Sequence, residues 1–245
     1  MMHRYHREIL EQIKRTSGKA THHTFLDHYL GNTHPRYPIN NGKLREIARA
    51  WMRTHRNITA GELSLVLDSL IKGKSSTEKC MVGMLLDYSK KEQRKFRPTL
   101  FDKWLNELEG WAEIDSLCTG KYSLTEIPEQ WPAWKRLSEK FSKSKNINKR
   151  RASLVIFCQP LRKVGEPEIL KTALRNTDRL CHEKEVLITK AISWVLRCAV
   201  KTFPEEIKKY VNLNKAKLPA IAVRETMRLI ETGRKTKRRI RNVEQ

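Results

Sequence analysis

Residues 59–88, TAGELSLVLDSLIKGKSSTEKCMVGMLLDY, decide the fold class of this chain. The stretch begins with TAGE, a capping box that satisfies free N–H groups at a helix start. Apolar residues then follow at helical spacing: Leu63, Val66, Leu67, Leu70 and Ile71. After the short loop 72–74, SSTE opens a second helix, whose apolar side is formed by Met81, Met84, Leu85 and Tyr88. Two helices joined by so short a loop predict an antiparallel helix pair.

The same helical pattern recurs along most of the chain. It predicts helices over roughly 3–15, 20–30, 42–55, 60–72, 76–90, 98–109, 111–120, 129–142, 147–158, 166–175, 183–202, 204–212 and 217–232. Because no segment alternates between apolar and polar residues with hairpin turns at its ends, the sequence predicts an all-α protein.

Short helices of this kind can form a globular bundle or a solenoid of stacked pairs. The pairs recur about every 35 to 40 residues, as HEAT-like repeats do. We therefore predict one solenoid domain of antiparallel HEAT/ARM-like helix pairs over residues 1–232. Residues 233–245 form a basic tail, which we expect to be flexible and either to attract phosphates or only to aid solubility.

The net charge of the chain indicates which kind of partner it binds. Fifty Lys and Arg against 27 Asp and Glu give a formal net charge of +23. Phosphate backbones are the commonest partners of such proteins, although a ribosome or an anionic membrane would also fit. No apolar run approaches the roughly 20 residues that span a bilayer, and the N-terminus has no apolar core of a secretion signal. We expect a cytoplasmic protein, associated with the nucleoid if the source is prokaryotic.

No cofactor or metal is predicted from the motifs. The five cysteines are odd in number and widely spaced, which fits thiols in a reducing compartment. Zinc spacings, iron–sulfur clusters of cysteine and glycine-rich phosphate loops do not occur in the sequence.

The stretch Trp111 to Asp115, WAEID, carries the candidate chemistry. Positions four apart on a helix lie one above the other, so an indole and a carboxylate face the same space. In so positive a chain, that space favours a polyanion. Arg150 and Arg151 follow about 35 residues later, and Trp194 and Arg197 lie one turn apart further on.

One carboxylate is enough for a particular reaction on DNA. A purine alkylated at N3 or N7 is positively charged and leaves without a general acid, while cationic charge develops on the deoxyribose. A fixed carboxylate stabilises that charge and orients the attacking water. At about 4 Å and an effective dielectric near 20, the attraction is on the order of 4 kcal/mol, roughly a thousandfold in rate.

Three motifs resemble the alkylpurine DNA glycosylases built from HEAT-like repeats, the AlkD type. WAEID resembles that family's Trp-x-x-x-Asp, RRASL at 150–154 its Arg-Ala helix start, and KAISWVLR at 190–197 its Lys-Ala-Ile-x-Trp-x-Leu-Arg. YPINNGKLR at 37–45 is similar to the segment that leads into an early repeat, and Glu78-Lys79 to a helix opening. The resemblance covers residues 20–232.

The resemblance implies a concave, basic superhelix that grips the duplex. It implies a monofunctional glycosylase in which Asp115 is catalytic, Trp111 and Trp194 contact the sugar, and Arg151 binds the phosphate backbone. Arg150 is the alternative to Arg151 in that role, and Asn40, Lys149 and Arg197 are further candidates for DNA contact. The implied partner is double-stranded DNA containing alkylated bases; neither a membrane nor an obligate protein partner is implied.

Structural explanations remain open for the same residues. Trp111 and Trp194 can be core aromatics, and Asp115 can be a surface acid paired with a cation. Arg197 can form an ion pair with Glu113 or Glu183 instead of contacting phosphate. The alternative function is a HEAT-like scaffold that binds nucleic acid without chemistry.

Overall fold

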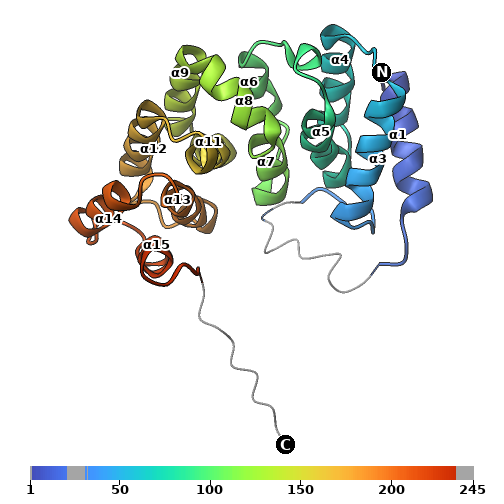
Figure 1. Cartoon of the computed structure of the whole chain (residues 1–245). Helices are drawn as coiled ribbons and strands as arrows, with labels where there is room; N and C mark the ends of the chain where they lie inside the picture. The colour runs from blue at the N-terminus through green and yellow to red at the C-terminus, as the bar shows by residue number, and fades with distance from the viewer. Residues whose placement is uncertain (1, 21–30, 32, 236–245) are drawn as a thin grey trace, which may run out of the picture.

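The computed structural model describes residues 2–20, 31 and 33–235, and all regular structure in these ranges is helical. The elements are α1 (Arg4–Thr16), α3 (Asn41–Thr54), α4 (Ala60–Ile71), α5 (Ser76–Tyr88), η1 (Glu92–Arg94), α6 (Thr99–Trp104), α7 (Gly110–Cys118), α8 (Lys121–Glu129), α9 (Trp131–Ser142), α10 (Ile147–Val155), α11 (Cys158–Lys163), α12 (Pro167–Leu180), α13 (Val186–Ala199), α14 (Pro204–Leu213) and α15 (Ala220–Thr232). They follow one another along an arc from α1 to α14 and α15 (Figure 1).

One row of helices runs through the molecule. α3, α5, α7, α10 and α13 each pack against the next helix in this series, and α15 packs against α13 at the end. The five helices of the series begin at residues 41, 76, 110, 147 and 186, which is an interval of 34 to 39 residues. Each is followed by the other helices of its own unit. The architecture is therefore an α-solenoid, as predicted.

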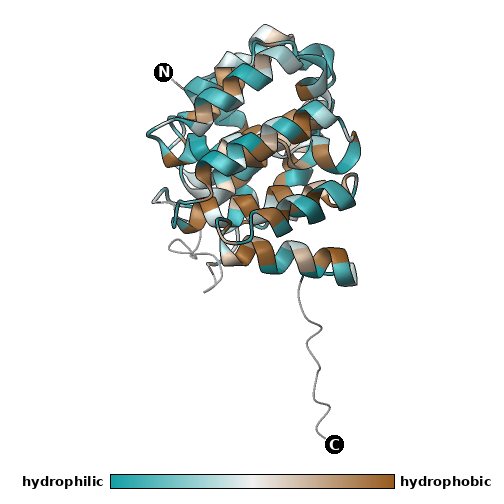
Figure 2. Ribbon diagram, turned by 90° about the vertical axis from the view of Figure 1, so that its left-hand side faces the viewer, coloured by the Kyte–Doolittle hydropathy of each residue, from teal (hydrophilic) through white to brown (hydrophobic). Residues whose placement is uncertain are grey.

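The capping boxes and apolar stripes of residues 59–88 form the predicted helix pair. Thr59 caps α4 and Ser75 caps α5, each with a glutamate three residues on. Leu63, Val66 and Leu67 are fully buried in the core. Helices carry hydrophobic and hydrophilic residues on different sides, so the core lies between the helix layers (Figure 2).

Several boundaries differ from the prediction. The stretch after α7 forms α8, which the sequence pattern did not predict because Pro128 interrupts it; Tyr122 and Ile127 nevertheless bury their side chains from this helix. α11 is a second helix that was not predicted. α12 continues to Leu180 instead of ending at residue 175, because Thr177 and Leu180 extend its buried side.

Two predictions fall wholly or largely outside the described residues. These are the helix at 20–30 and the basic tail, of which only 233–235 are described. The single domain over 1–232 stays a prediction. Within the described ranges, no helix has the length and apolar character needed to cross a membrane. The five cysteines form no disulfide.

Candidate functional site

Helix α7 carries Trp111 and Asp115, and its start is shaped by a glycine and a glutamate. Gly110 has a φ of 64°, a left-handed conformation that residues with a side chain rarely adopt. The Glu109 N–H donates to Oε2 of Glu113 at 2.9 Å, which satisfies a backbone group at the helix start. Glu113 is fully buried, and it also binds Nδ1 of His34 at 3.0 Å. This acid therefore holds the start of the helix.

The Asp115 carboxylate is held in a fork by Arg151. Nε donates to Oδ1 at 2.9 Å and Nη2 donates to Oδ2 at 2.8 Å, while Nη1 donates to the Leu187 carbonyl at 2.6 Å. The Arg151 side chain is 5% exposed and that of Asp115 is 14% exposed. The fork joins α7 to α10, and the third bond joins α10 to α13. Three successive units of the solenoid thus meet at Asp115.

Two effects oppose each other in the protonation of Asp115. Burial raises the pKa of its carboxyl, and the charge and hydrogen bonds of Arg151 counteract this rise. An ionised carboxylate accepts about four hydrogen bonds, of which Arg151 supplies two. Among the described residues, Arg151 is the only donor to the Asp115 side chain. The other lone pairs of the carboxylate are available to accept hydrogen bonds from a water or a bound molecule beside it.

Asp115 lines a hollow of about 730 Å³ between α3, α5, α7 and the segment before α3. Trp111, Ser116 and Thr119 line it from α7, and Lys19, Arg36 and Arg45 bring cations to it. Tyr37, from the segment before α3, is a second aromatic in the wall of the hollow. Among the described residues, the lining of the hollow therefore combines one carboxylate, two aromatics and several cations.

The segment 33–39 is fixed as a wall of this hollow. The Thr33 N–H and hydroxyl both donate to Oε2 of Glu109, at 3.0 and 2.8 Å. The Pro35 carbonyl accepts from the Ser76 N–H at 2.8 Å, and the Tyr37 N–H donates to the Thr77 hydroxyl at 3.0 Å. The segment is thereby tied to the N-terminal ends of both α5 and α7.

Comparison with known proteins identifies the family and the fold of the chain. A family described as "DNA alkylation repair enzyme" matches residues 8–230. The chain belongs to this family. Its structure is similar to one described as "Predicted DNA alkylation repair enzyme from Enterococcus faecalis", with a TM-score of 0.67 over 86% of this chain and 96% of that chain. At 16% identity, that likeness speaks for the fold. No curated protein matches the chain in sequence.

The structure brings some predicted residues to the hollow. Asn40 lines it and caps α3, accepting from the Lys43 N–H at 2.9 Å. Arg151 lies behind Asp115, where its guanidinium is engaged with protein groups. Contact of Arg151 with phosphate stays a prediction, while its fork on Asp115 is a structural fact.

Two neighbouring cations are also engaged in ion pairs. Arg150 forms a fork with Glu183 at 2.8 and 3.1 Å and donates to the carbonyls of Ser144 and Lys145. Lys149 binds Asp102 at 2.6 Å and is 13% exposed. These contacts tie the loop and start of α10 to the surrounding helices. Their roles in DNA contact stay predictions.

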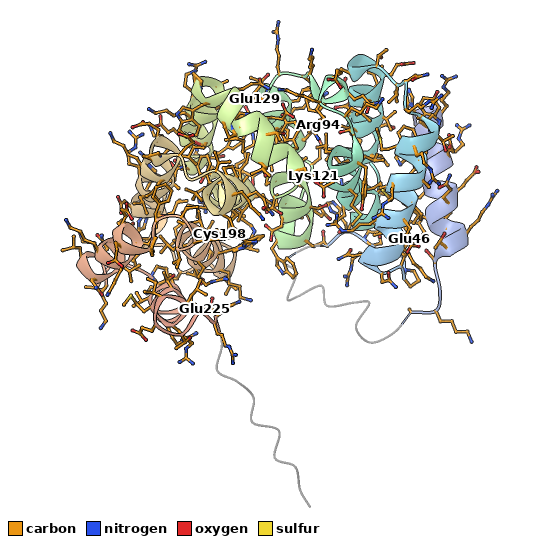
Figure 3. The ribbon with its side chains drawn as sticks, in the orientation of Figure 1. Glu46, Arg94, Lys121, Glu129, Cys198 and Glu225 are labelled. Atoms are coloured by element: carbon orange, nitrogen blue, oxygen red, sulfur yellow. The ribbon has the colours of Figure 1, made fainter. Side chains whose placement is uncertain are left out.

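Trp194 and Arg197 lie outside the lining of the hollow. Trp194 is partly buried and packs against the core, seven residues beyond Leu187 on α13. Arg197 binds Glu225 of α15 at 3.3 Å. Glu225 is labelled in Figure 3. The alternative of an ion pair for Arg197 named Glu113 or Glu183; the acid is instead Glu225, because the packing of α15 on α13 could not be seen in the sequence.

Sequence reasoning missed other residues that line the hollow. Arg36, Tyr37, Asn41 and Arg45 all lie in or beside the segment that resembles the family, yet only Asn40 was selected from it. The available signal was their place just before and within the first turns of α3. No group of three or more His, Cys, Asp or Glu that could hold a metal ion occurs in the described part of the chain.

Proposed function

We propose that this protein is a DNA glycosylase that hydrolyses the N-glycosidic bond of N3- or N7-alkylated purines in duplex DNA. The observation that carries the proposal is the Arg151 fork, which holds the Asp115 carboxylate at the wall of a hollow shared with Trp111. Membership of a DNA alkylation repair family supports DNA as the substrate.

The proposed reaction needs one acid because the substrate carries its own activation. The bond from the sugar C1′ to the purine nitrogen breaks, and its electron pair neutralises the positive charge of the alkylated base. Water adds to C1′ and releases a proton. Asp115 stabilises the cationic sugar electrostatically and orients that water through its remaining lone pairs. The products are the free alkylated base and an abasic site.

Fixed geometry is what the surrounding residues supply. Because both Asp115 oxygens are held by Arg151, the carboxylate does not need to reorganise as charge develops on the sugar. Trp111 provides an apolar plate one turn before Asp115, and Trp194 is proposed as a second sugar contact. Lys19, Arg36 and Arg45 supply charge for the phosphates beside the lesion.

Asp115→Asn tests the assignment. The amide keeps the size of the side chain and loses its charge, so excision of 7-methylguanine and 3-methyladenine from methylated duplex should fall at least 100-fold. Duplex affinity should stay within about threefold, since Asp115 contributes no attraction to phosphate. Released bases are measured by chromatography under single-turnover conditions.

A matched control is Glu126→Gln. Glu126 is also a buried acid bound to an arginine, Nε of Arg94, at 3.0 Å, but it lies on α8 outside the hollow. This variant should lose stability as Asp115→Asn does and retain the excision rate. Full excision by Asp115→Asn would refute the assignment, and duplex binding by the wild type without any abasic product would favour the non-catalytic scaffold.

A further inference from the structure

A second hollow of about 320 Å³ lies at the other end of α3 and is lined mainly by cations. Its residues are Arg49, Met52, Arg53 and Arg56 on or just after α3, and Tyr88, Lys90 and Gln93 at the end of α5 and the following loop. No carboxylate of the described part of the chain lines it. The backbone of this hollow is fixed by Gln93, which donates to the carbonyls of Arg56 and Ile58 and accepts from the Lys90 N–H.

Three cations on the elements around this hollow are paired with acids. Arg45 pairs with Asp87, Lys91 with Glu129 and Arg94 with Glu126. Within the described ranges, Arg49, Arg53, Arg56 and Lys90 form no ion pair with an acid. Exposed cations that gather without an acid repel one another, and this repulsion is relieved when an anion binds.

A row of arginines on one side of α3 leads from the first hollow to the second. Arg45, Arg49 and Arg53 are spaced four residues apart, so they lie near one another on the helix surface. Arg45 lines the first hollow and Arg49 the second. Arg49 donates to the Tyr88 hydroxyl at 3.3 Å, and its guanidinium lies 5.2 Å from the centre of the Tyr88 ring. Glu46, on the same helix, lies toward its lower end (Figure 3) and forms no ion pair with these arginines.

We propose that this second hollow binds the phosphodiester backbone of the duplex several nucleotides from the damaged base. The proposal rests on the proposed function for its partner, and it adds a second anchoring site on one arm of the DNA. From Arg45 to Arg53, both on α3, the helix rises about 12 Å at 1.5 Å per residue. One strand of B-DNA carries a phosphate about every 3.4 Å along the axis, so a strand that runs alongside α3 meets the two sites about three to four nucleotides apart.

The test is a charge-removal variant, Arg49→Gln/Arg53→Gln/Lys90→Gln. Its matched control is Lys208→Gln/Lys209→Gln/Lys215→Gln, which removes the same charge from exposed lysines on and just after α14. Binding to an unmodified duplex is measured from about 50 to 200 mM salt. The first variant should bind roughly tenfold more weakly at 0.1 M salt, and its slope of log K against log salt should fall by about 2.7, at 0.9 per lost phosphate contact. The control should match the wild type in both.

Duplex length separates a local site from a general loss of charge. Two duplexes are compared, each with the arm on one side of the lesion shortened to about three base pairs. Only one of these two shortenings should weaken binding of the wild type. The triple variant should be insensitive to that shortening. The inference would be overturned if the triple variant had the same affinity and salt slope as the lysine control. It would also be overturned if the wild type responded equally to shortening of either arm, or if the second hollow bound free inorganic phosphate but not the duplex.

Failure of this inference and of the proposed function are distinguishable. With the variant in saturating excess, the excision rate should equal that of the wild type, because the second hollow is remote from Asp115. A wild type that binds through this hollow but releases no base would refute only the glycosylase assignment.

Discussion

At the scale of residues, the Asp115–Arg151 pair combines a fixed geometry with access to the hollow. The buried pair of Arg94 and Glu126 provides a contrast, because Arg94 also binds the carbonyls of Leu86 and Ser89 and its acid is only 5% exposed. That pair holds a loop in place. Asp115 keeps lone pairs toward a hollow with aromatic and cationic walls, which is the arrangement that electrostatic catalysis needs.

Removing the Arg151 charge should change the pH dependence of excision. In the proposed mechanism only ionised Asp115 stabilises a cationic sugar, so the excision rate should rise with pH through the pKa of this group. Arg151 favours the ionised form; in Arg151→Met the pKa of Asp115 should rise further, and the acidic limb of the rate–pH profile should move to higher pH.

A second variant separates this effect from loss of folding. Breaking one partner of a buried ion pair costs about 3–5 kcal/mol, so Arg151→Met is expected to be less stable. Arg151→Lys keeps the charge and loses the fork. Its maximal excision rate should fall, while the acidic limb of its rate–pH profile should move less than that of Arg151→Met. The full pH profile of each variant at 15 °C checks the prediction, and unchanged limbs in both would contradict it.

At the scale of elements, the position of α7 depends on its close approach to α5. A Cβ built on Gly83 of α5 would lie 1.8 Å from the Ser116 carbonyl oxygen of α7. The Ser116 hydroxyl donates to the Cys80 carbonyl at 2.7 Å in the same contact. Since Ser116 follows Asp115, the distance between these helices sets where the carboxylate stands.

Gly83→Ala should therefore separate the two helices. We expect the free energy of unfolding to fall by about 1–3 kcal/mol, as overpacking does, and excision to fall more than duplex affinity. Gly61→Ala is the control, because the nearest atom to a Cβ there is the Thr59 hydroxyl at 4.0 Å. That variant should be slightly more stable and fully active. Denaturant unfolding measures the free energy of unfolding of both variants. A Gly83→Ala variant as stable and as active as the wild type would contradict the close contact between α5 and α7.

At the scale of the whole molecule, burial decreases toward the C-terminal end of the solenoid. Ten of the 13 residues of α5 are buried, against two of the 13 in α15. In a solenoid each unit is stabilised mainly by its neighbours, so a terminal helix has fewer of them.

Hydrogen exchange should follow this gradient. Amides of α5 should exchange at least roughly 100-fold more slowly than those of α15, because terminal units open locally while central ones open only with the whole. Mass-spectrometric exchange on the intact protein measures both helices, which have equal length. Equal protection along the chain would show that the solenoid opens as one unit.

Much of the architecture was predictable from local sequence. The capping residues and apolar stripes of residues 59–88 determine helices by themselves, because both act within a few residues of the chain. The short α8 and α11 were missed, since a helix with Pro128 near its end owes its stability to packing. Trp51, Trp104, Trp131 and Trp134 belong to no motif with a partner residue, which predicts a packing role; the first, second and fourth are buried, and Trp131 is partly buried against the core.

The sequence by itself determined an all-α repeat protein with a basic surplus and a Trp–Asp pair on one helix, because periodicity and charge are local or additive properties. Only the tertiary structure decided that Arg151 grips Asp115, that Arg197 pairs with Glu225, and that segment 33–39 walls the hollow. These contacts join residues more than 25 positions apart. Their partners are selected by how whole helices stack, which no local pattern encodes.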